Sequence, residues 1–275
     1  MPPVPSYEST RTIANTYNRL GSLWDEMAHT SPFLINSYRL LDRCLSELVK
    51  TASPTRVLDM GCGSGAHSFY LGHHAKEVIG VDLSETQIGI AANRSAALDH
   101  VRFQVGNACR LPYRDESFDC VISYGDVISH IIDRYEEAIA EMARVARPNA
   151  IVTFEADTKW NLGLLYHPLE LLDALRAKGV GHTTREWEGM RFKTFTYKEL
   201  KAILAKHHLD ILSCKGHNIF ASLIPDRFLL EKGSRSLLGR LALGLGRLDL
   251  RLSNVYPFNR FGFNFVITAR KRGHP

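Results

Sequence analysis

The chain has 275 residues, of which 45% are hydrophobic and 23% are charged. This composition is typical of a globular enzyme and excludes a disordered or collagen-like chain. No apolar run approaches the roughly 20 residues that a membrane-spanning helix needs, and the first residues show no secretory signal, so we expect a cytoplasmic protein.

The formal charge of +5 is unevenly distributed along the chain. Residues 1–184 carry 17 Lys and Arg against 22 Asp and Glu, a net charge of −5, whereas residues 185–275 carry 17 against 7, a net charge of +10. This basic last third suggests an anionic partner at that end, and a solvated basic face explains it equally well.

Cysteine and histidine spacing argues against cross-links and bound metal. The five cysteines are an odd number without a C-x-x-C pair, and the twelve histidines show no H-E-x-x-H spacing. We therefore expect neither a disulfide framework nor a metal site.

Apolar residues at helical spacing predict helices over residues 13–27 and 32–50. The pattern then changes to short apolar strands separated by helices. We expect the strands at residues 56–59, 77–83, 101–105, 118–124, 150–155, 209–215 and 261–270. One helix should begin after Ser84, which has capping-box spacing with Gln87, and another should run from Tyr135 and stop before Pro148. This alternation is typical of an open, mainly parallel α/β sheet, which binds ligands beyond the carboxyl ends of its strands.

The first of these strands runs into a glycine-rich turn over residues 61–65, with the spacing G-x-G-x-G. Dinucleotide-binding proteins have G-x-G-x-x-G instead. Asp59 precedes the turn, where a carboxylate suits a cationic amino group better than a pyrophosphate. Asp82 ends the second strand, 17 residues past Gly65, where a carboxylate can accept both ribose hydroxyls of an adenosine ligand.

These motifs resemble those of class I S-adenosylmethionine-dependent methyltransferases, of the small-molecule group that includes the ubiquinone and menaquinone methyltransferases. The resemblance runs from Tyr17 to about Glu155 and rests on VLDMGCGSG, VDLSETQI, VGNACRLPYRDESFDCVIS and the helix ending in ARP. It implies a Rossmann-like, seven-stranded, mostly parallel sheet flanked by helices, with an N-terminal helical lid and C-terminal cap insertions. It also implies S-adenosylmethionine as the cofactor.

The resemblance implies a set of cofactor contacts. These are Tyr17, Asp59, Gly61, Cys62, Gly63, Gly65, Asp82, Leu83, Asn107, Ala108 and Ser123. The glycines would line the methionine part, above Ser123, while Asp82 would hold the ribose and Leu83 would flank the adenine. Asn107 stands where the family usually has an aspartate near the adenine amine, and its side-chain oxygen can still accept a hydrogen bond.

The resemblance also organises the chain into regions. Residues 1–50 would form the lid, because Tyr17-Asn18 and Trp24-Asp25 match the spacing of the family's Y-D-x-x-A-x-x-Y-D element; aromatic residues at this spacing fit a core helix equally well. Residues 51–156 would form the cofactor-binding core. Residues 157–275 would complete it, with substrate caps at about 157–197 and 216–260.

Methyl transfer by in-line displacement requires mainly alignment of the acceptor and exclusion of water. Tyr124, Asp126 and His130 follow the fourth strand and are our candidates for acceptor contact or proton removal. His130 has an alternative role as a histidine that braces this segment. Aromatic residues in the expected caps suit an apolar or ring-containing acceptor, or pack the caps themselves. They are Trp160, Tyr166, His167, His182, Trp187, Phe192 and Phe195.

Residues 236–253 form an apolar stripe beside an arginine row if they are helical. Six leucines fall within an arc of about 100° and three arginines beside them, at about 100° per residue. Three glycines weaken the helix prediction. The segment is either an interfacial helix that contacts anionic lipid or a surface helix packed on the domain.

We therefore expect methyl transfer to the oxygen, nitrogen or carbon of a small-molecule acceptor, which is apolar, anionic or lipid-like. One alternative is an RNA or protein methyltransferase that uses the basic end, although no RNA-binding module is visible and we do not expect a nucleic acid partner. Another is a nucleotide-binding protein that does not methylate. The oligomeric state is not indicated by the sequence.

Overall fold

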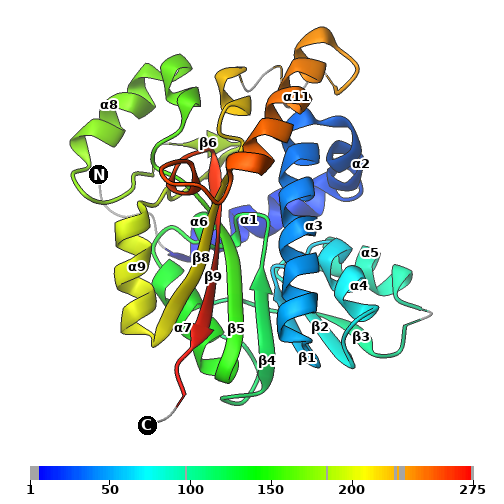
Figure 1. The fold of residues 1–275 in the computed structure, drawn as a ribbon. Coiled ribbons are helices and arrows are strands. Elements are labelled where there is room, and N and C mark those ends of the chain that lie inside the picture. Colours follow the sequence, from blue (N-terminus) through cyan, green and yellow to red (C-terminus); the bar gives the residue numbers. More distant parts are fainter. Residues whose placement is uncertain (1–5, 97, 184, 226–227, 229–232, 274–275) are drawn as a thin grey trace.

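The computed structural model describes residues 6–96, 98–183, 185–225, 228 and 233–273. Seven strands form one sheet (Figure 1). They are β1 (Arg56–Met60), β2 (Glu77–Asp82), β3 (Val101–Val105), β4 (Phe118–Ser123), β5 (Ala146–Asp157), β8 (Leu209–His217) and β9 (Asn264–Lys271). The order across the sheet is β3-β2-β1-β4-β5-β9-β8. Only β9 runs antiparallel to its neighbours, so the predicted Rossmann-like, mostly parallel sheet is confirmed.

The strand order reverses at β1, which pairs with β2 on one side and with β4 on the other. The chain segments that leave β1 and β4 therefore diverge, and a crevice opens between them at the carboxyl ends of the strands. Both faces of β1 are buried, because Val57 and Leu58 point to opposite sides and each is fully covered.

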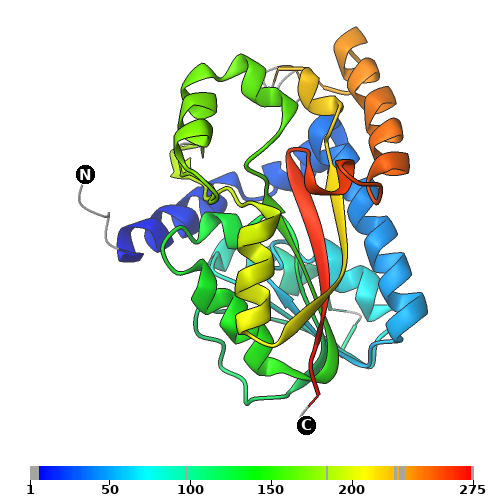
Figure 2. The same ribbon diagram turned by 60° about the vertical axis from the view of Figure 1, so that its left-hand side comes forward.

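Helices cover both faces of the sheet (Figure 2). One face carries α3 (Pro32–Ala52) and α4 (Ala66–Gly72), whose apolar side chains share a core with Val57. The other carries α6 (Val127–His130), α7 (Tyr135–Val145) and α9 (Tyr197–Lys206), which share a core with Leu58. The helix α5 (Glu85–Arg94) packs beside β2 and β3.

The helix predicted over residues 13–27 is two helices in the structure. They are α1 (Ser6–Leu20) and α2 (Leu23–Thr30). Gly21 lies between them with φ +50°, a left-handed conformation that glycine adopts readily and that ends the first helix. The predicted helix over residues 32–50 is confirmed as α3, and Oγ of Ser31 caps it by accepting a hydrogen bond from the amide of Leu34 at 3.4 Å.

Ser84 begins α5 as predicted, since its Oγ accepts a hydrogen bond from the amide of Gln87 at 3.1 Å. The Gln87 side chain does not complete the capping box. It donates instead to the carbonyl oxygens of Gly21, at 2.9 Å, and Tyr17, at 3.4 Å. This amide therefore ties the N-terminal helices to the sheet domain.

Two insertions lie before α9 and after β8 in sequence. The first contains η1 (Leu162–Tyr166), α8 (Pro168–Arg176) and a two-stranded sheet of β6 (Glu186–Trp187) and β7 (Met190–Arg191). The second contains η2 (Ala221–Leu223), α11 (Leu237–Leu252) and η3 (Phe258–Arg260). Figures 1 and 2 show α8 and α11 at the same end of the molecule, beyond the carboxyl ends of β4 and β5. Across the described ranges, no helix is both long and apolar enough to span a bilayer.

Candidate active site

A cavity of about 930 Å³ lies at the crevice between the segments that follow β1 and β4. Its walls come from α1, α3, the turns after the parallel strands and the first insertion. Eight of the predicted cofactor contacts line it. They are Tyr17, Gly61, Cys62, Gly63, Asp82, Leu83, Asn107 and Ala108. All three predicted acceptor-side residues, Tyr124, Asp126 and His130, line it too. The sequence motifs thus converge on one cavity.

The glycine-rich turn is fastened to β2 and leaves space on its cavity side. The amides of Gly61 and Cys62 donate to the carbonyl of Val81 at 2.7 and 3.1 Å. A side chain at Gly61 would place its Cβ 2.2 Å from Cγ2 of Val127, so this position requires glycine. A Cβ at Gly63 would meet no atom within 4 Å, and its φ of +52° also favours glycine. The backbone at Gly63 therefore borders open space that a ligand can approach closely.

Asp82 is held rigidly at the rim of this space. Its carboxylate accepts hydrogen bonds from the amides of Gly63, at 2.9 Å, and Ser84, at 2.8 Å. Burial raises the pKa of Asp82, and these two amide hydrogen bonds oppose the rise. Each carboxylate oxygen can accept a further hydrogen bond, so the group can still bind a pair of hydroxyls.

Asn107 has one interaction that the sequence did not predict. Its Oδ1 accepts a hydrogen bond from the amide of Cys109 at 2.8 Å, which closes the turn after β3. One lone pair of this oxygen is used in the turn, and the second remains for a ligand.

Three of the predicted cofactor contacts do not line the cavity: Asp59, Gly65 and Ser123. Gly65 lies under the turn, where a Cβ would meet the rings of Phe103 and Phe69 at 2.8 and 2.9 Å. Ser123 is fully buried at the end of β4. These two residues therefore shape the turn and the sheet beneath the cavity.

Asp59 is a buried carboxylate beneath the turn, with one oxygen occupied. Oδ2 accepts a hydrogen bond from Oγ of Ser68 at 2.6 Å, and Oδ1 has no hydrogen-bond partner among the described residues. Burial raises the pKa of Asp59 to about 7. A buried carboxylate with a free oxygen is costly unless a positive group approaches it.

The N-terminal helices dock onto the cavity rim through polar side chains. Oγ of Ser84 donates to Oδ1 of Asn18 at 2.6 Å, and Oγ of Ser64, in the glycine-rich turn, donates to Oδ1 of Asp25 at 2.5 Å. Tyr17 lines the cavity from the same region. Tyr17 thus borders the cavity, and the lid remains a prediction, while the side chain of Trp24 lies outside the described residues.

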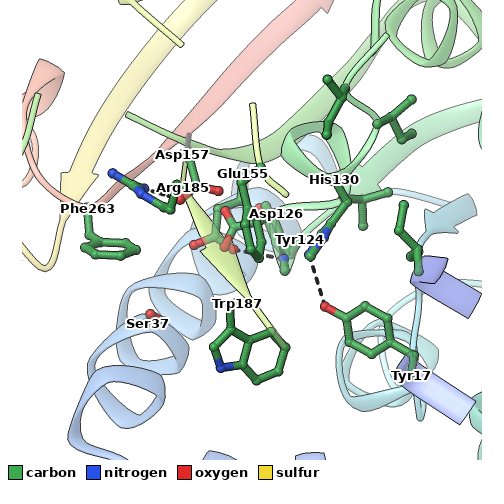
Figure 3. Close-up of a pocket in the computed structure, with 18 of the residues that line it drawn as sticks. Tyr17, Ser37, Tyr124, Asp126, His130, Glu155, Asp157, Arg185, Trp187 and Phe263 are labelled. Carbon is green, nitrogen blue, oxygen red and sulfur yellow. Dashed lines mark hydrogen bonds and ion pairs between the residues drawn. The ribbon is translucent and has the colours of Figure 1, made fainter. Parts of the chain in front are cut away.

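Tyr17 and His130 contact one another at the wall of the cavity (Figure 3). The Tyr17 hydroxyl lies 3.0 Å from Nε2 of His130, and the two rings meet edge to face. Burial raises the pKa of Tyr17 and lowers the pKa of His130 to about 4. His130 is therefore neutral near pH 7, and its ring also packs against Phe192.

Tyr124 and Asp126 differ in the hydrogen bonds that their side chains make within the protein. The Tyr124 hydroxyl lies 3.2 Å from Oγ1 of Thr153, deep in the sheet. Asp126 has the left-handed φ of +59°, which is strained for a residue other than glycine. Its Oδ1 accepts a hydrogen bond from the Asn264 side chain, and burial raises its pKa, as do the nearby carboxylates of Glu155 and Asp157.

A cluster of carboxylates at the end of β5 was missed by the sequence analysis. Glu155 and Asp157 lie two residues apart on one face of β5, and both line the cavity. Figure 3 shows them grouped with Asp126, beside Arg185. Two polar residues at alternate positions in a buried apolar strand were the signal that could have revealed this cluster.

The cations beside these carboxylates are already paired. Arg185 forms ion pairs with Asp157 and Glu170, and its guanidinium lies over the ring of Phe263 at 4.4 Å. His217 Nε2 lies 2.5 Å from Oε1 of Glu155. Burial raises the pKa of Glu155, but the charge and hydrogen bond of His217 outweigh this effect and lower it. Asp126 is thus a carboxylate without an ion pair to any described cation, and the acceptor side of the cavity is acidic.

Apolar and aromatic side chains form the rest of the acceptor side. They are Phe33, Leu34, Tyr38, Leu41, Tyr166, Leu169, Leu172, Trp187, Phe192 and Phe263. Of the expected cap aromatics, Tyr166, His167, Trp187 and Phe192 line the cavity, and Trp160, His182 and Phe195 do not. The first insertion therefore contributes to the wall, whereas no described residue of 216–260 lines the cavity. The basic helix α11 packs on α3 instead.

Comparison with known proteins identifies the segment that carries the glycine-rich turn. Residues 58–154 match the family model described as a methyltransferase domain. This chain contains a methyltransferase domain. Methyltransferase GfsG of Streptomyces halstedii is 33% identical over 129 residues, which are 46% of this chain and 45% of that protein. Demethylmenaquinone methyltransferase of Staphylococcus aureus is 34% identical over 102 residues, which are 36% of this chain and 41% of that protein. The matched part is less than half the length of these relatives.

Solved structures extend the likeness of the methyltransferase domain to most of the chain. The [4+2]-cyclase SpnF has a TM-score of 0.63 at 19% identity, over 95% of this chain and 96% of that one. The magnesium protoporphyrin IX methyltransferase of Synechocystis PCC 6803, solved with bound S-adenosylhomocysteine, has a TM-score of 0.62 at 17% identity, over 94% and 98%. These likenesses establish the class I methyltransferase fold. Since a cyclase shares it, the fold alone does not determine the reaction.

Proposed function

We propose that this chain transfers a methyl group from S-adenosylmethionine to a small-molecule acceptor. The observation that carries the proposal is the open space beside Gly63, bordered by the fixed carboxylate of Asp82, inside the segment that matches the methyltransferase domain. At this point of the sheet, where the strand order reverses, a ligand can approach the backbone of Gly63 closely and can bind its hydroxyl groups to the Asp82 carboxylate.

The residues present fit S-adenosylmethionine part by part. The open side of Gly63 suits the methionine chain, and Asp82 suits the ribose, while Asp59 lies beneath the turn and outside the cavity lining. The residues predicted to contact the adenine line the same cavity. They are Leu83, Asn107 and Ala108. When bound, the cofactor supplies a methyl group already activated by its sulfonium.

The residues of this chain then need to align the acceptor with the methyl group and to exclude water. Tyr17 lies over the cavity and is held by His130, so the N-terminal helices close the cofactor side. We assign His130 to this bracing role, because a histidine with a pKa of about 4 is a weak base near pH 7. Tyr124 braces the sheet through Thr153. Asp126 is the residue we propose to contact the acceptor and to accept a proton from it.

The acceptor side favours a molecule that presents N–H or O–H donors beside a ring. Its carboxylates outnumber its cations, and Arg185 is saturated by Asp157 and Glu170. The arginines among the described lining residues are already in ion pairs, so an anionic acceptor would find no free cation there. We therefore replace the anionic acceptor suggested by the charge distribution with an amine or hydroxyl compound, whose ring packs among the aromatic side chains of the wall.

The size of the site favours this function over its alternatives. A cavity of about 930 Å³ is in the range of small-molecule sites. A nucleic acid acceptor would require an accessible basic channel, and the acceptor side is acidic.

The test is methyl transfer by the purified chain from cofactor labelled in its methyl group. The acceptors are aromatic amines, phenols, aromatic carboxylic acids and bulk RNA. We expect label in the amine or phenol class, and a loss of about a hundredfold in Asp126→Asn, the scale of general acid–base catalysis. Asp210→Asn, at an exposed ion pair with Arg272, serves as the matched control. Label in RNA or in carboxylic acids, or full activity of Asp126→Asn, would contradict the proposal.

A further inference from the structure

The helix α11 buries a face of small residues and exposes four of its eight leucines. The fully covered positions are Gly239, Ala242, Gly246 and Asp249. By contrast, Leu237 is 75% exposed, Leu241 is 53% exposed and Leu248 is 41% exposed. A surface helix normally does the opposite and turns its large apolar side chains toward the domain.

Close packing on α3 fixes this orientation. A Cβ at Gly246 would lie 2.1 Å from Oδ1 of Asn36, and Nδ2 of Asn36 donates to the carbonyl of Ala242 at 3.1 Å. The helix backbone thus rests directly on an α3 side chain, which only a small residue permits.

A buried carboxylate fixes the far end of the same face. Asp249 accepts hydrogen bonds from the amides of Phe220 and Ala221 at 2.9 and 3.2 Å. Rotating α11 to bury its leucines would break these hydrogen bonds and place large side chains where the packing against α3 leaves no space. The packing of the small-residue face therefore keeps these leucines exposed in the folded chain.

The exposed side of α11 carries a row of arginines beside its leucines. At about 100° per residue, Leu237, Leu241 and Leu248 fall within an arc of about 40°. Arg240, Arg247 and Arg251 form a row beside them, and all three side chains are exposed. None of these arginines forms an ion pair with another side chain in the described part of the chain. We call this combination of three leucines and three arginines the α11 face.

We propose that the α11 face binds the surface of an anionic lipid bilayer, with the leucines at the acyl boundary and the arginines on the headgroups. Charge complementarity selects this occupant: unpaired arginines flank an apolar stripe along one side of a helix, the pattern of helices that lie in a membrane interface. Both figures show α11 on the outside of the molecule, beyond α3, where a planar surface can reach it. The inference does not depend on the methyl-transfer proposal, because the α11 face lies outside the cavity.

Co-sedimentation with vesicles tests the proposal on the full chain. We expect binding to mixed phosphatidylglycerol–phosphatidylcholine vesicles that weakens with added salt, and no binding to phosphatidylcholine alone. Replacing Arg240, Arg247 and Arg251 with Gln should weaken binding about a hundredfold, since each arginine near an anionic surface contributes about fivefold. Replacing Leu237, Leu241 and Leu248 with Ser should weaken it about tenfold or more.

Matched variants separate the α11 face from general charge and general exposed apolar surface. Replacing the exposed Arg191, Lys198 and Lys201 with Gln removes the same charge from another surface, and replacing the exposed Leu165 and Leu175 with Ser removes leucines near α8. Both controls should keep vesicle binding. No binding by the unmodified chain, equal loss in the controls, or a leucine-dependent dimer in analytical ultracentrifugation would overturn the proposal.

Discussion

The hydroxyl of Tyr17 lies 3.0 Å from Nε2 of His130, and this contact joins the N-terminal helix to the segment that follows β4. It is the point at which the two sides of the cavity meet. Removing the hydroxyl in Tyr17→Phe should weaken S-adenosylhomocysteine binding about fivefold, the size of one hydrogen bond. Calorimetry measures this change, and Tyr70→Phe, outside the cavity, should bind as the unmodified chain does. Unchanged affinity in Tyr17→Phe would show that the Tyr17 hydroxyl does not help to close the cofactor site.

His130 should brace the site rather than accept a proton. Because burial lowers its pKa to about 4, its ring is neutral throughout the neutral range and offers little basicity. We expect His130→Gln, which keeps a polar side chain, to retain turnover within about fivefold with an unchanged pH profile. The measurement is kcat against pH with the accepted substrate. A collapse of kcat together with loss of an inflection would assign the base role to His130.

Gly63 should be required for the cofactor and nearly dispensable for the fold. In Gly63→Ala the new methyl group meets no protein atom, so the strain of φ +52° should cost about 1 kcal/mol of unfolding free energy. The same methyl group occupies the space assigned to the methionine chain, and S-adenosylhomocysteine binding should be lost.

The control for Gly63 is Gly89→Ala on α5. A Cβ there also meets nothing within 4 Å, and alanine in a helix interior should stabilise the fold by up to about 1 kcal/mol. Cofactor binding should be unaffected in this variant. Retained binding in Gly63→Ala would show that the ligand lies elsewhere.

Asp59 should make the ligand-free protein less stable at high pH. Burial raises its pKa to about 7 in the folded chain, whereas the unfolded chain releases this proton near pH 4. The folded state therefore binds more protons between these values, and the free energy of unfolding falls as pH rises through that window.

The variant that tests this is Asp59→Asn, which has no proton to release. It should melt at a higher temperature than the unmodified chain at about pH 8 and show a smaller difference at about pH 4. Equal melting temperatures at both pH values would contradict the account, and Asp99→Asn on the surface is the matched control.

The sequence predicted most of the sheet and eight residues that line the cavity around the glycine-rich turn, because both depend on local patterns. Apolar runs and the glycine spacing specify β1, β2 and the turn directly. The break at Gly21 was missed because the apolar period continues across it, and only the left-handed φ shows where the helix ends. The strand β9 begins at Asn264, three residues later than predicted, after the 3₁₀ helix η3.

The acceptor side was harder to predict because it depends on contacts between distant segments. Arg185 and His217 meet the carboxylates of β5 only in the folded chain, so the net charge of the last third did not reveal the carboxylates of this wall. The orientation of α11 was missed for a similar reason: the leucine stripe dominates the helical wheel, but the close approach of Asn36 to Gly246 decides which side is buried.

Calorimetric titration of the purified chain with S-adenosylhomocysteine tests the central claim most directly. The account predicts saturable binding of one molecule per chain, no binding of NAD⁺, and affinity reduced about tenfold or more in Asp82→Ala, the cost of losing hydrogen bonds to a charged group. Asp99→Ala on the surface should bind as the unmodified chain does. No binding of S-adenosylhomocysteine, binding of NAD⁺ instead, or full affinity in a folded Asp82→Ala would contradict the account.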